Sequence, residues 1–188
     1  MDRKSNILRK ALELFNTTNT QASTTNHIAK AMQISPGNLH YHYKNREEII
    51  RELYKQMKVK YTLQPSEFPN TLAELLDANK KSFNIQWEYR FFYTELLFLL
   101  SRDPQLKKEY MKDAIAKKDR YRVIFKQLQN KQVLSFSTES DIDYLVDMIL
   151  LIEQFWISYI KISSSKQPDI NIAIKQIEKI IEPFDSQL

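Results

Sequence analysis

The stretch TTNHIAKAMQISPGNLHYHY, residues 24–43, decides the fold of the first third of this 188-residue chain. Its apolar residues recur at helical spacing in two short blocks. Thr24 is placed to cap the first block and Ser35 to cap the second, which begins with Pro36, a residue that the first helical position tolerates. The pattern therefore predicts two short helices joined by a tight turn, at about 24–32 and 36–43.

Amphipathic segments lie on both sides of this pair. The apolar spacing predicts a first helix from about Arg3 to Asn16. Asn45 and Glu48 have the spacing of a capping box and open a fourth helix, which ends before the prolines of TLQPSEFPN, residues 62–70. Two short helices flanked by longer ones match the helix-turn-helix plan, in which the second short helix enters the major groove of DNA.

The remaining residues predict longer helices, at about 70–87, 88–101, 103–130, 139–163 and 169–184. One Gly and six Pro are few for a protein rich in tight turns, so we expect an all-α fold. We place a domain boundary in the proline-containing segment. Residues 1–62 would form a helix-turn-helix domain that includes the fourth, linking helix, and residues 63–188 a larger helical domain.

Composition also limits the compartment and the partners. The absence of Cys suits a reducing cytosol, we see no export signal, and no apolar run approaches the roughly 20 residues that span a bilayer. We therefore expect a cytoplasmic protein. Residues 1–62 hold 11 Lys or Arg against 5 Asp or Glu, and residues 63–188 hold 17 against 18. This local excess indicates nucleic acid or an anionic membrane surface as partner, although a solvated basic surface without a partner stays open.

Three blocks carry a resemblance to a known family: ILRKALELF (7–15), TTNHIAKAM (24–32) and ISPGNLHYHYKNREEII (34–50). Together they resemble the N-terminal domain of the tetracycline-repressor (TetR) family, whose members are all-helical, dimeric, ligand-responsive transcription regulators, mostly repressors. Asn19 and Gln33 stand where the family usually has Gly, and Gln is poorly suited to a left-handed backbone. His40 replaces a common Tyr, and Tyr43 a common Phe.

The resemblance implies a set of DNA contacts. Hydroxyls and backbone N–H groups at the start of the second helix would bind phosphates, and Asn26 would lie near the groove. The first turn of the third helix would meet base edges, with Asn38 the best candidate to read adenine. For Tyr41, packing beneath the helix is an open alternative, and for Tyr43 it is the favoured interpretation. The implied contact residues are Thr24, Thr25, Asn26, Pro36, Gly37, Asn38, His40, Tyr41, Lys44 and Arg46.

The resemblance also assigns small-molecule binding and dimerisation to the larger domain. The last two long helices, at about 139–163 and 169–184, would form the homodimer, unless their apolar faces are intrachain core. Clustered aromatic residues suit an apolar or aromatic effector, and an inward Glu95 would favour a cationic one. The candidate pocket residues are Trp87, Phe91, Phe92, Tyr93, Glu95, Gln154 and Trp156.

The main hypothesis is thus a ligand-responsive repressor that binds a double-stranded DNA operator. A helical carrier of apolar small molecules, with its basic end on a membrane surface, is the alternative. An enzyme is the least favoured reading, because no catalytic set or cofactor motif stands out. His40 and His42 are two residues apart and point in different directions on a helix, so we expect no metal site.

Overall fold

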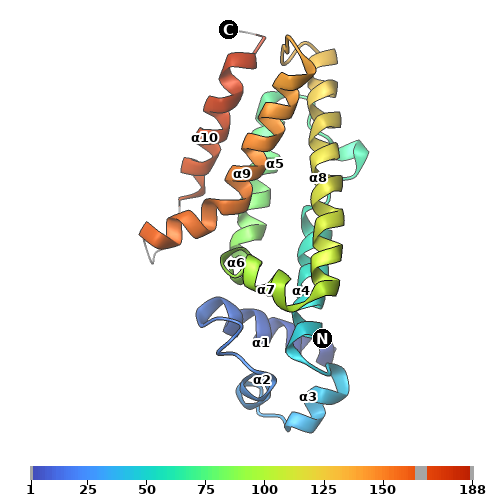
Figure 1. Ribbon diagram of the computed structural model, residues 1–188, viewed down its shortest axis with the longest axis vertical. Coiled ribbons are helices and arrows are strands. Elements are labelled where there is room, and N and C mark those ends of the chain that lie inside the picture. Colours follow the sequence, from blue (N-terminus) through green and yellow to red (C-terminus); the bar gives the residue numbers. More distant parts are fainter. Residues whose placement is uncertain (1, 164–168, 187–188) are drawn as a thin grey trace. The chain divides into compact units, whose positions relative to one another are not determined.

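The computed structural model describes residues 2–163 and 169–186. In this part of the chain the backbone forms ten α-helices and two short 3₁₀ helices (Figure 1), which confirms the all-α prediction. The elements are α1 (Arg3–Thr17), α2 (Thr25–Ala31), α3 (Pro36–His42), α4 (Arg46–Tyr61), η1 (Pro65–Glu67), α5 (Leu72–Glu88), α6 (Arg90–Thr94), α7 (Leu96–Arg102), α8 (Pro104–Asn130), α9 (Glu139–Ser163), α10 (Ile170–Ile181) and η2 (Glu182–Phe184).

The chain divides into two compact units. The first comprises Met1–Lys60 and Glu88–Lys107, and the second Tyr61–Trp87 and Lys108–Leu188. The segment that holds α6 and α7 therefore packs with the helix-turn-helix, although it lies far from it in the sequence. The proposed functional domains, 1–62 and 63–188, are a different division of the chain and remain a prediction.

Side-chain caps define the short helices of the first unit as the sequence predicts. The Thr24 hydroxyl accepts from the backbone N–H of His27 at 3.4 Å, and the Ser35 hydroxyl accepts from that of Asn38 at 3.2 Å. The Asn45 side chain accepts from the N–H of Glu48 at 2.9 Å, ahead of α4. These bonds satisfy N–H groups that have no partner in the first turn of a helix.

The turn between α2 and α3 carries backbone strain. Gln33 has a φ of 56°, in the left-handed region that glycine adopts without penalty. The structure therefore confirms the unfavourable left-handed conformation expected of Gln33. Asn19, the other departure from the family pattern, does not have a positive φ. Its side chain instead accepts from the N–H of Ala22 at 2.6 Å, as Asn commonly does in turns.

The prediction of one helix is wrong. The segment expected as a continuous helix over 88–101 is two helices, α6 and α7, which meet at Glu95 with a φ of −115°. The Glu95 carboxylate accepts from the hydroxyl of Thr20 at 2.6 Å and from its backbone N–H at 3.0 Å. These bonds hold Glu95 against the α1–α2 loop, and they occur where the helix is interrupted.

In the second unit α5, α8, α9 and α10 enclose one apolar core. Fully buried residues such as Phe125, Leu145 and Ile177 come from three different helices of the unit. The predicted apolar stripe of α10 faces this core, since Ala173, Ile177 and Ile181 are completely buried. Tyr121 of α8 bridges Asn79 of α5 and Glu153 of α9 through its hydroxyl, so the three helices also share a polar contact inside the unit.

Candidate nucleic-acid interface

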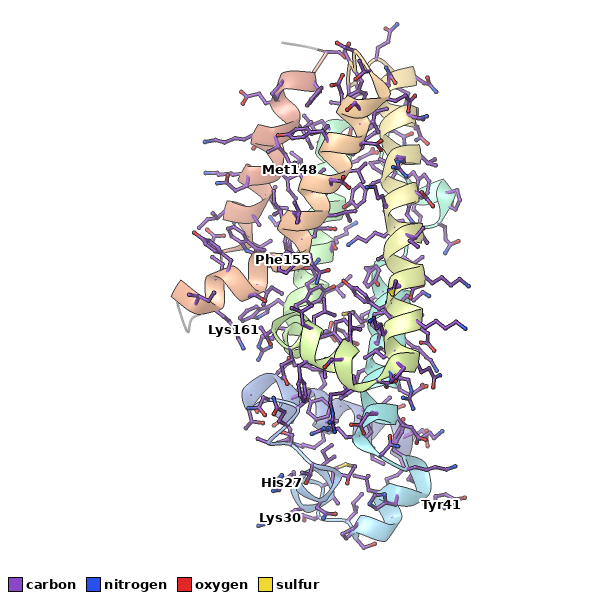
Figure 2. All side chains as sticks on the ribbon, in the orientation of Figure 1. His27, Lys30, Tyr41, Met148, Phe155 and Lys161 are labelled. Carbon is purple, nitrogen blue, oxygen red and sulfur yellow. The ribbon has the colours of Figure 1, made fainter. Side chains whose placement is uncertain are left out.

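Helix α3 presents almost all of its side chains to solvent. Of its seven residues only Leu39 is buried, while Asn38 and His40 on either side of it are exposed. Tyr41 has 86% of its surface exposed and points away from the helix (Figure 2). Packing beneath the helix is therefore wrong for Tyr41. Packing beneath the helix is right for Tyr43, which is buried. This burial raises the pKa of Tyr43 to about 12.

The single glycine of the chain has no structural requirement in this fold. Gly37 does not have a positive φ, and a Cβ added to it would meet no closer atom than the Ser35 hydroxyl at 4.0 Å. In a helix Gly is less stable than Ala by about 0.5–1 kcal/mol. The described residues therefore leave the backbone of this turn uncovered at Gly37.

The N-terminus of α2 adds a second exposed polar surface. Thr24 and Asn26 are exposed, and Thr25 is half-buried. His27 and Lys30 project from the same helix (Figure 2), and both are exposed. Neither was among the residues singled out in the sequence. Lys30 had only the local charge excess to indicate it.

Two of the three histidines have backbone partners next to this surface. The Nδ1 atom of His27 lies 2.6 Å from the carbonyl oxygen of Ala22, and Nδ1 of His40 lies 3.1 Å from that of Lys44. Each imidazole thus supports the conformation of its own segment. The side chain of Lys44 is exposed beside α3.

Arg46 is used within the first unit. Its Nη1 donates to the carbonyl oxygen of Thr20 at 2.5 Å, its Nη2 lies 3.4 Å from the Glu47 carboxylate, and 20% of its side chain is exposed. Arg46 and Glu95 therefore hold Thr20 from two elements. Arg46 was among the implied DNA contacts, and in the structure its guanidinium fixes the loop before α2.

The side chain of Asn16 ties α1 to the segment that contains α6. Its amide nitrogen donates to the carbonyl oxygen of Glu88 at 2.7 Å, and its amide oxygen accepts from the N–H of Phe91 at 3.1 Å. The ring of Phe91 also lies 5.2 Å from that of Phe15 on α1. A displacement of α6 would therefore be transmitted to α1.

The candidate pocket residues fall into both compact units. Phe91, Phe92, Tyr93 and Glu95 belong to the first unit, and Trp87, Gln154 and Trp156 to the second. Phe92 is buried and stacked on Tyr54 of α4, with the ring centroids 5.1 Å apart. Phe91, Phe92 and Glu95 thus have identified partners inside the first unit.

The interior of the second unit holds a polar cluster that the sequence did not reveal. Glu153 is only 2% exposed, and its carboxylate lies 2.6 Å from Nζ of Lys117. The Tyr121 hydroxyl lies 3.0 Å from the Asn79 amide oxygen and 3.2 Å from the Glu153 carboxylate. Burial, and then the charge of Glu153, raise the pKa of Tyr121 well above its usual value, so its hydroxyl stays protonated.

Helix α9 carries a second apolar stripe besides the one that faces the core. Figure 2 labels Met148 and Phe155 on this helix. Phe155 is 51% exposed and Ile162 87% exposed. The stripe recurs every three or four residues, the spacing at which residues share a helix face. Its members are Tyr144, Met148, Leu151, Phe155, Tyr159 and Ile162.

Comparisons with known proteins cover the same regions. The family described as "Bacterial regulatory proteins, tetR family" matches residues 7–53, and the family described as "Bacterial transcriptional repressor" matches residues 46–184. A crystal structure of a TetR-family transcriptional regulator from Marinobacter aquaeolei VT8 is 29% identical over 98% of this chain and 92% of its own, with a TM-score of 0.90. No curated protein matches the chain.

Two more distant structures share the fold. A transcriptional regulator from Saccharomonospora viridis in complex with choline is 14% identical over 95% of each chain, with a TM-score of 0.76. The SmeT–triclosan complex is 14% identical over 93% of this chain and 88% of the other, with a TM-score of 0.60. None of the helices in the described part of this chain is long and apolar enough to cross a membrane.

Proposed function

The chain belongs to the TetR family of DNA-binding transcriptional regulators, a family without enzymatic activity, and we propose that it is a cytoplasmic homodimeric repressor that a small molecule releases from its operator. DNA binding is assigned to residues 1–62, and effector binding and dimerisation to residues 63–188.

The observation that carries this proposal is the exposed surface of α3. Only one of the seven residues of α3 is buried, so α3 contributes little to the core of the first unit. Its other side chains are available to contact a partner. Asn38 offers the amide donor and acceptor that match adenine in the major groove, and Gly37 allows close approach. Asn26 and Pro36 would border the groove. Arg46 would contact a phosphate as well as fix the loop before α2. The other residues assigned to phosphate contacts are Thr24, Thr25, Lys30, His40, Tyr41 and Lys44.

The dimer is assigned chiefly to the exposed stripe of α9. An apolar stripe of this length on a helix is suited to pairing with its own copy across a two-fold axis. The apolar face of α10 is largely used within the chain, and Ile172, 47% exposed, is its main apolar residue left on the surface. A two-fold dimer would bind a pseudo-palindromic operator with half-sites about one turn, or a multiple of it, apart.

Release requires the effector to bind better to a form with the wrong half-site geometry. A regulator of the same fold is known in complex with choline and another in complex with triclosan, which supports a small-molecule effector. Helices α5 and α8 each continue from the second compact unit into the first. A change that displaces α6 would reach the helix-turn-helix through Asn16 and through the contact of Glu95 with Thr20.

The direct test is a gel-shift assay with DNA from the promoter region of the protein's own gene. We expect a complex that prefers this DNA to a scrambled duplex and weakens as salt rises. Glu95→Gln should weaken the hold on Thr20 and change the effector response more than the affinity without effector. Absence of any sequence-preferring complex, together with co-sedimentation on anionic liposomes, would favour the carrier instead.

A further inference from the structure

The interior of the second compact unit contains polar atoms that lack partners. Gln86 on α5 is 1% exposed, yet its amide oxygen has no hydrogen-bond partner among the described residues. The same holds for the amide nitrogen of Gln154 and the indole nitrogen of Trp156, both on α9. Buried polar atoms are nearly always paired, so three unpaired ones on facing helices indicate a missing partner.

Helix geometry places Gln86 and Trp156 in one section of the unit. Tyr121 bridges Asn79 on α5 and Glu153 on α9, and from that level both helices run in the same direction (Figure 1). Gln86 lies on the same side of α5 as Asn79, about 10 Å further along, and Trp156 lies on the same side of α9 as Glu153, about 5 Å further along. Phe83, fully buried between Asn79 and Gln86, supplies an aromatic wall.

Charge in this section is already balanced. The Glu153 carboxylate has Lys117 as its counter-ion, and the neutral Tyr121 hydroxyl lies beside it. A cationic ligand would compete with Lys117 for Glu153, and an anionic ligand would compete with Glu153 for Lys117. An uncharged ligand disturbs neither group.

The unpaired atoms also specify hydrogen-bonding chemistry. Gln154 and Trp156 offer two N–H donors, and Gln86 offers one acceptor. A hydroxyl group both accepts and donates, so a single hydroxyl can accept from Trp156 and donate to Gln86, whose levels along the two helices differ by about 5 Å. The Tyr121 hydroxyl has one hydrogen and lies near two acceptors, Asn79 and Glu153. A second donor group on the ligand would pair with the acceptor that Tyr121 leaves over.

We infer that the effector is an uncharged aromatic molecule that carries a hydroxyl group, held by Gln86 and Trp156. Its ring packs against the aromatic residues of the same section. This inference rests on the proposed function in one respect, that the molecule bound here is the one that releases DNA.

The experiment uses the full chain without DNA and three probes: phenol, its methyl ether anisole, and choline. The chain has two Trp, so a ¹⁵N spectrum contains two indole N–H signals, and Trp87→Phe identifies that of Trp156. We expect phenol to shift the Trp156 signal and to bind ~10-fold more tightly than anisole, which cannot donate to Gln86. Choline should leave the signal unchanged.

The variant Gln86→Met keeps the side-chain volume and removes the acceptor. It should reduce the preference for phenol over anisole to about one, a result that a purely structural role of Gln86 would not produce. Asn84→Leu, an exposed position on the same helix, is the control and should keep the preference. If Gln86→Met does not fold, Trp156→Phe tests the same site, because it removes one donor and should weaken phenol and anisole alike.

Three results would overturn the inference: equal binding of phenol and anisole to the wild type, tighter binding of choline, or no shift of the Trp156 signal with any probe. Operator binding is measured separately. Phenol binding without an operator complex would reject the proposed function and keep the site, and an operator complex without phenol binding would do the reverse.

Discussion

Helices α3 and α9 both leave residues on the surface that the fold does not use, and the chemistry of the two surfaces is opposite. The exposed side of α3 consists of an amide, an imidazole, a phenol and a bare glycine backbone. The exposed stripe of α9 consists mostly of hydrocarbon, with Leu151 and Phe155 about half exposed and Ile162 almost fully so.

The two surfaces fit different kinds of partner. Protein–DNA interfaces are polar and wet, and their specificity comes from hydrogen-bonding groups that reach base edges. The core of a homodimer interface is apolar, like a domain core cut in half. We therefore expect substitutions on α3 to affect DNA binding alone, and substitutions on α9 to affect assembly first and DNA binding as a consequence.

The largest effect is expected on α9. Phe155→Glu introduces a charge twice into a two-fold interface and should weaken the dimer by ~1000-fold. Analytical ultracentrifugation at micromolar concentration should then find monomer, and affinity for an operator with two half-sites should fall accordingly. Val123→Glu, at an apolar position of α8 that is 54% exposed, is the matched control and should remain dimeric. A dimeric Phe155→Glu protein would remove α9 from the interface.

The next effect is expected at Gly37. Gly37→Ala adds a methyl group that has room in the protein, so the melting temperature should stay the same or rise. The same methyl group should hinder approach to DNA in both half-sites and weaken operator binding by ~100-fold. Fluorescence anisotropy and thermal melting measure the two quantities. Gln56→Ala, at an exposed position of α4, is the control, and unchanged DNA affinity of Gly37→Ala would contradict the role given to this turn.

A narrower effect is expected at Asn38. Asn38→Ala should relax the preference at one base pair of each half-site by ~1–3 kcal/mol, while leaving the dimer intact. Affinities for a series of single-base operator variants would reveal the position. Lys44→Ala is the contrasting change, because losing a phosphate contact should weaken all variants alike and reduce the salt slope by about one unit. If Asn38→Ala behaved like Lys44→Ala, Asn38 would not be a base-reading residue.

The smallest effect is expected at Gln33, and it concerns stability alone. Gln33→Gly relieves the φ of 56° and should raise the free energy of unfolding by about 1 kcal/mol, because Gly adopts this region without a Cβ penalty. Chemical denaturation measures the gain. Gln132→Gly, at a φ of 58°, should behave in the same way and serves as a comparison outside the helix-turn-helix. A loss of stability in Gln33→Gly would mean that the Gln side chain has a favourable contact that outweighs its strain.

The sequence predicted what depends on local pattern. Three features follow from residues that are near each other in the sequence. They are the caps at Thr24 and Ser35, the buried stripe of α10 and the unfavourable backbone conformation of Gln33. The break at Glu95 does not, because its partner Thr20 is 75 residues away. The polar cluster around Glu153 escaped for the same reason, since its partners come from other helices and only the fold brings them together.

The candidate site shows the same limit. Exposure of α3 follows from its helical pattern, but the engagement of Arg46 with Thr20 and the extra lysine at position 30 needed coordinates. For the pocket, aromatic residues such as Phe92 looked the same in sequence whether they face a ligand or a neighbouring ring. The structure gives Phe92 the ring of Tyr54 as its partner.

Sequence-specific DNA binding by α3 is tested by fluorescence anisotropy of the wild-type protein with its promoter operator and with a scrambled duplex, over a range of salt concentrations. We expect the operator to be bound at least ~10³-fold more tightly, and log affinity for both duplexes to fall linearly with log salt. Equal affinity for the two duplexes at every salt concentration would contradict this expectation, because the surface of α3 would then read no sequence.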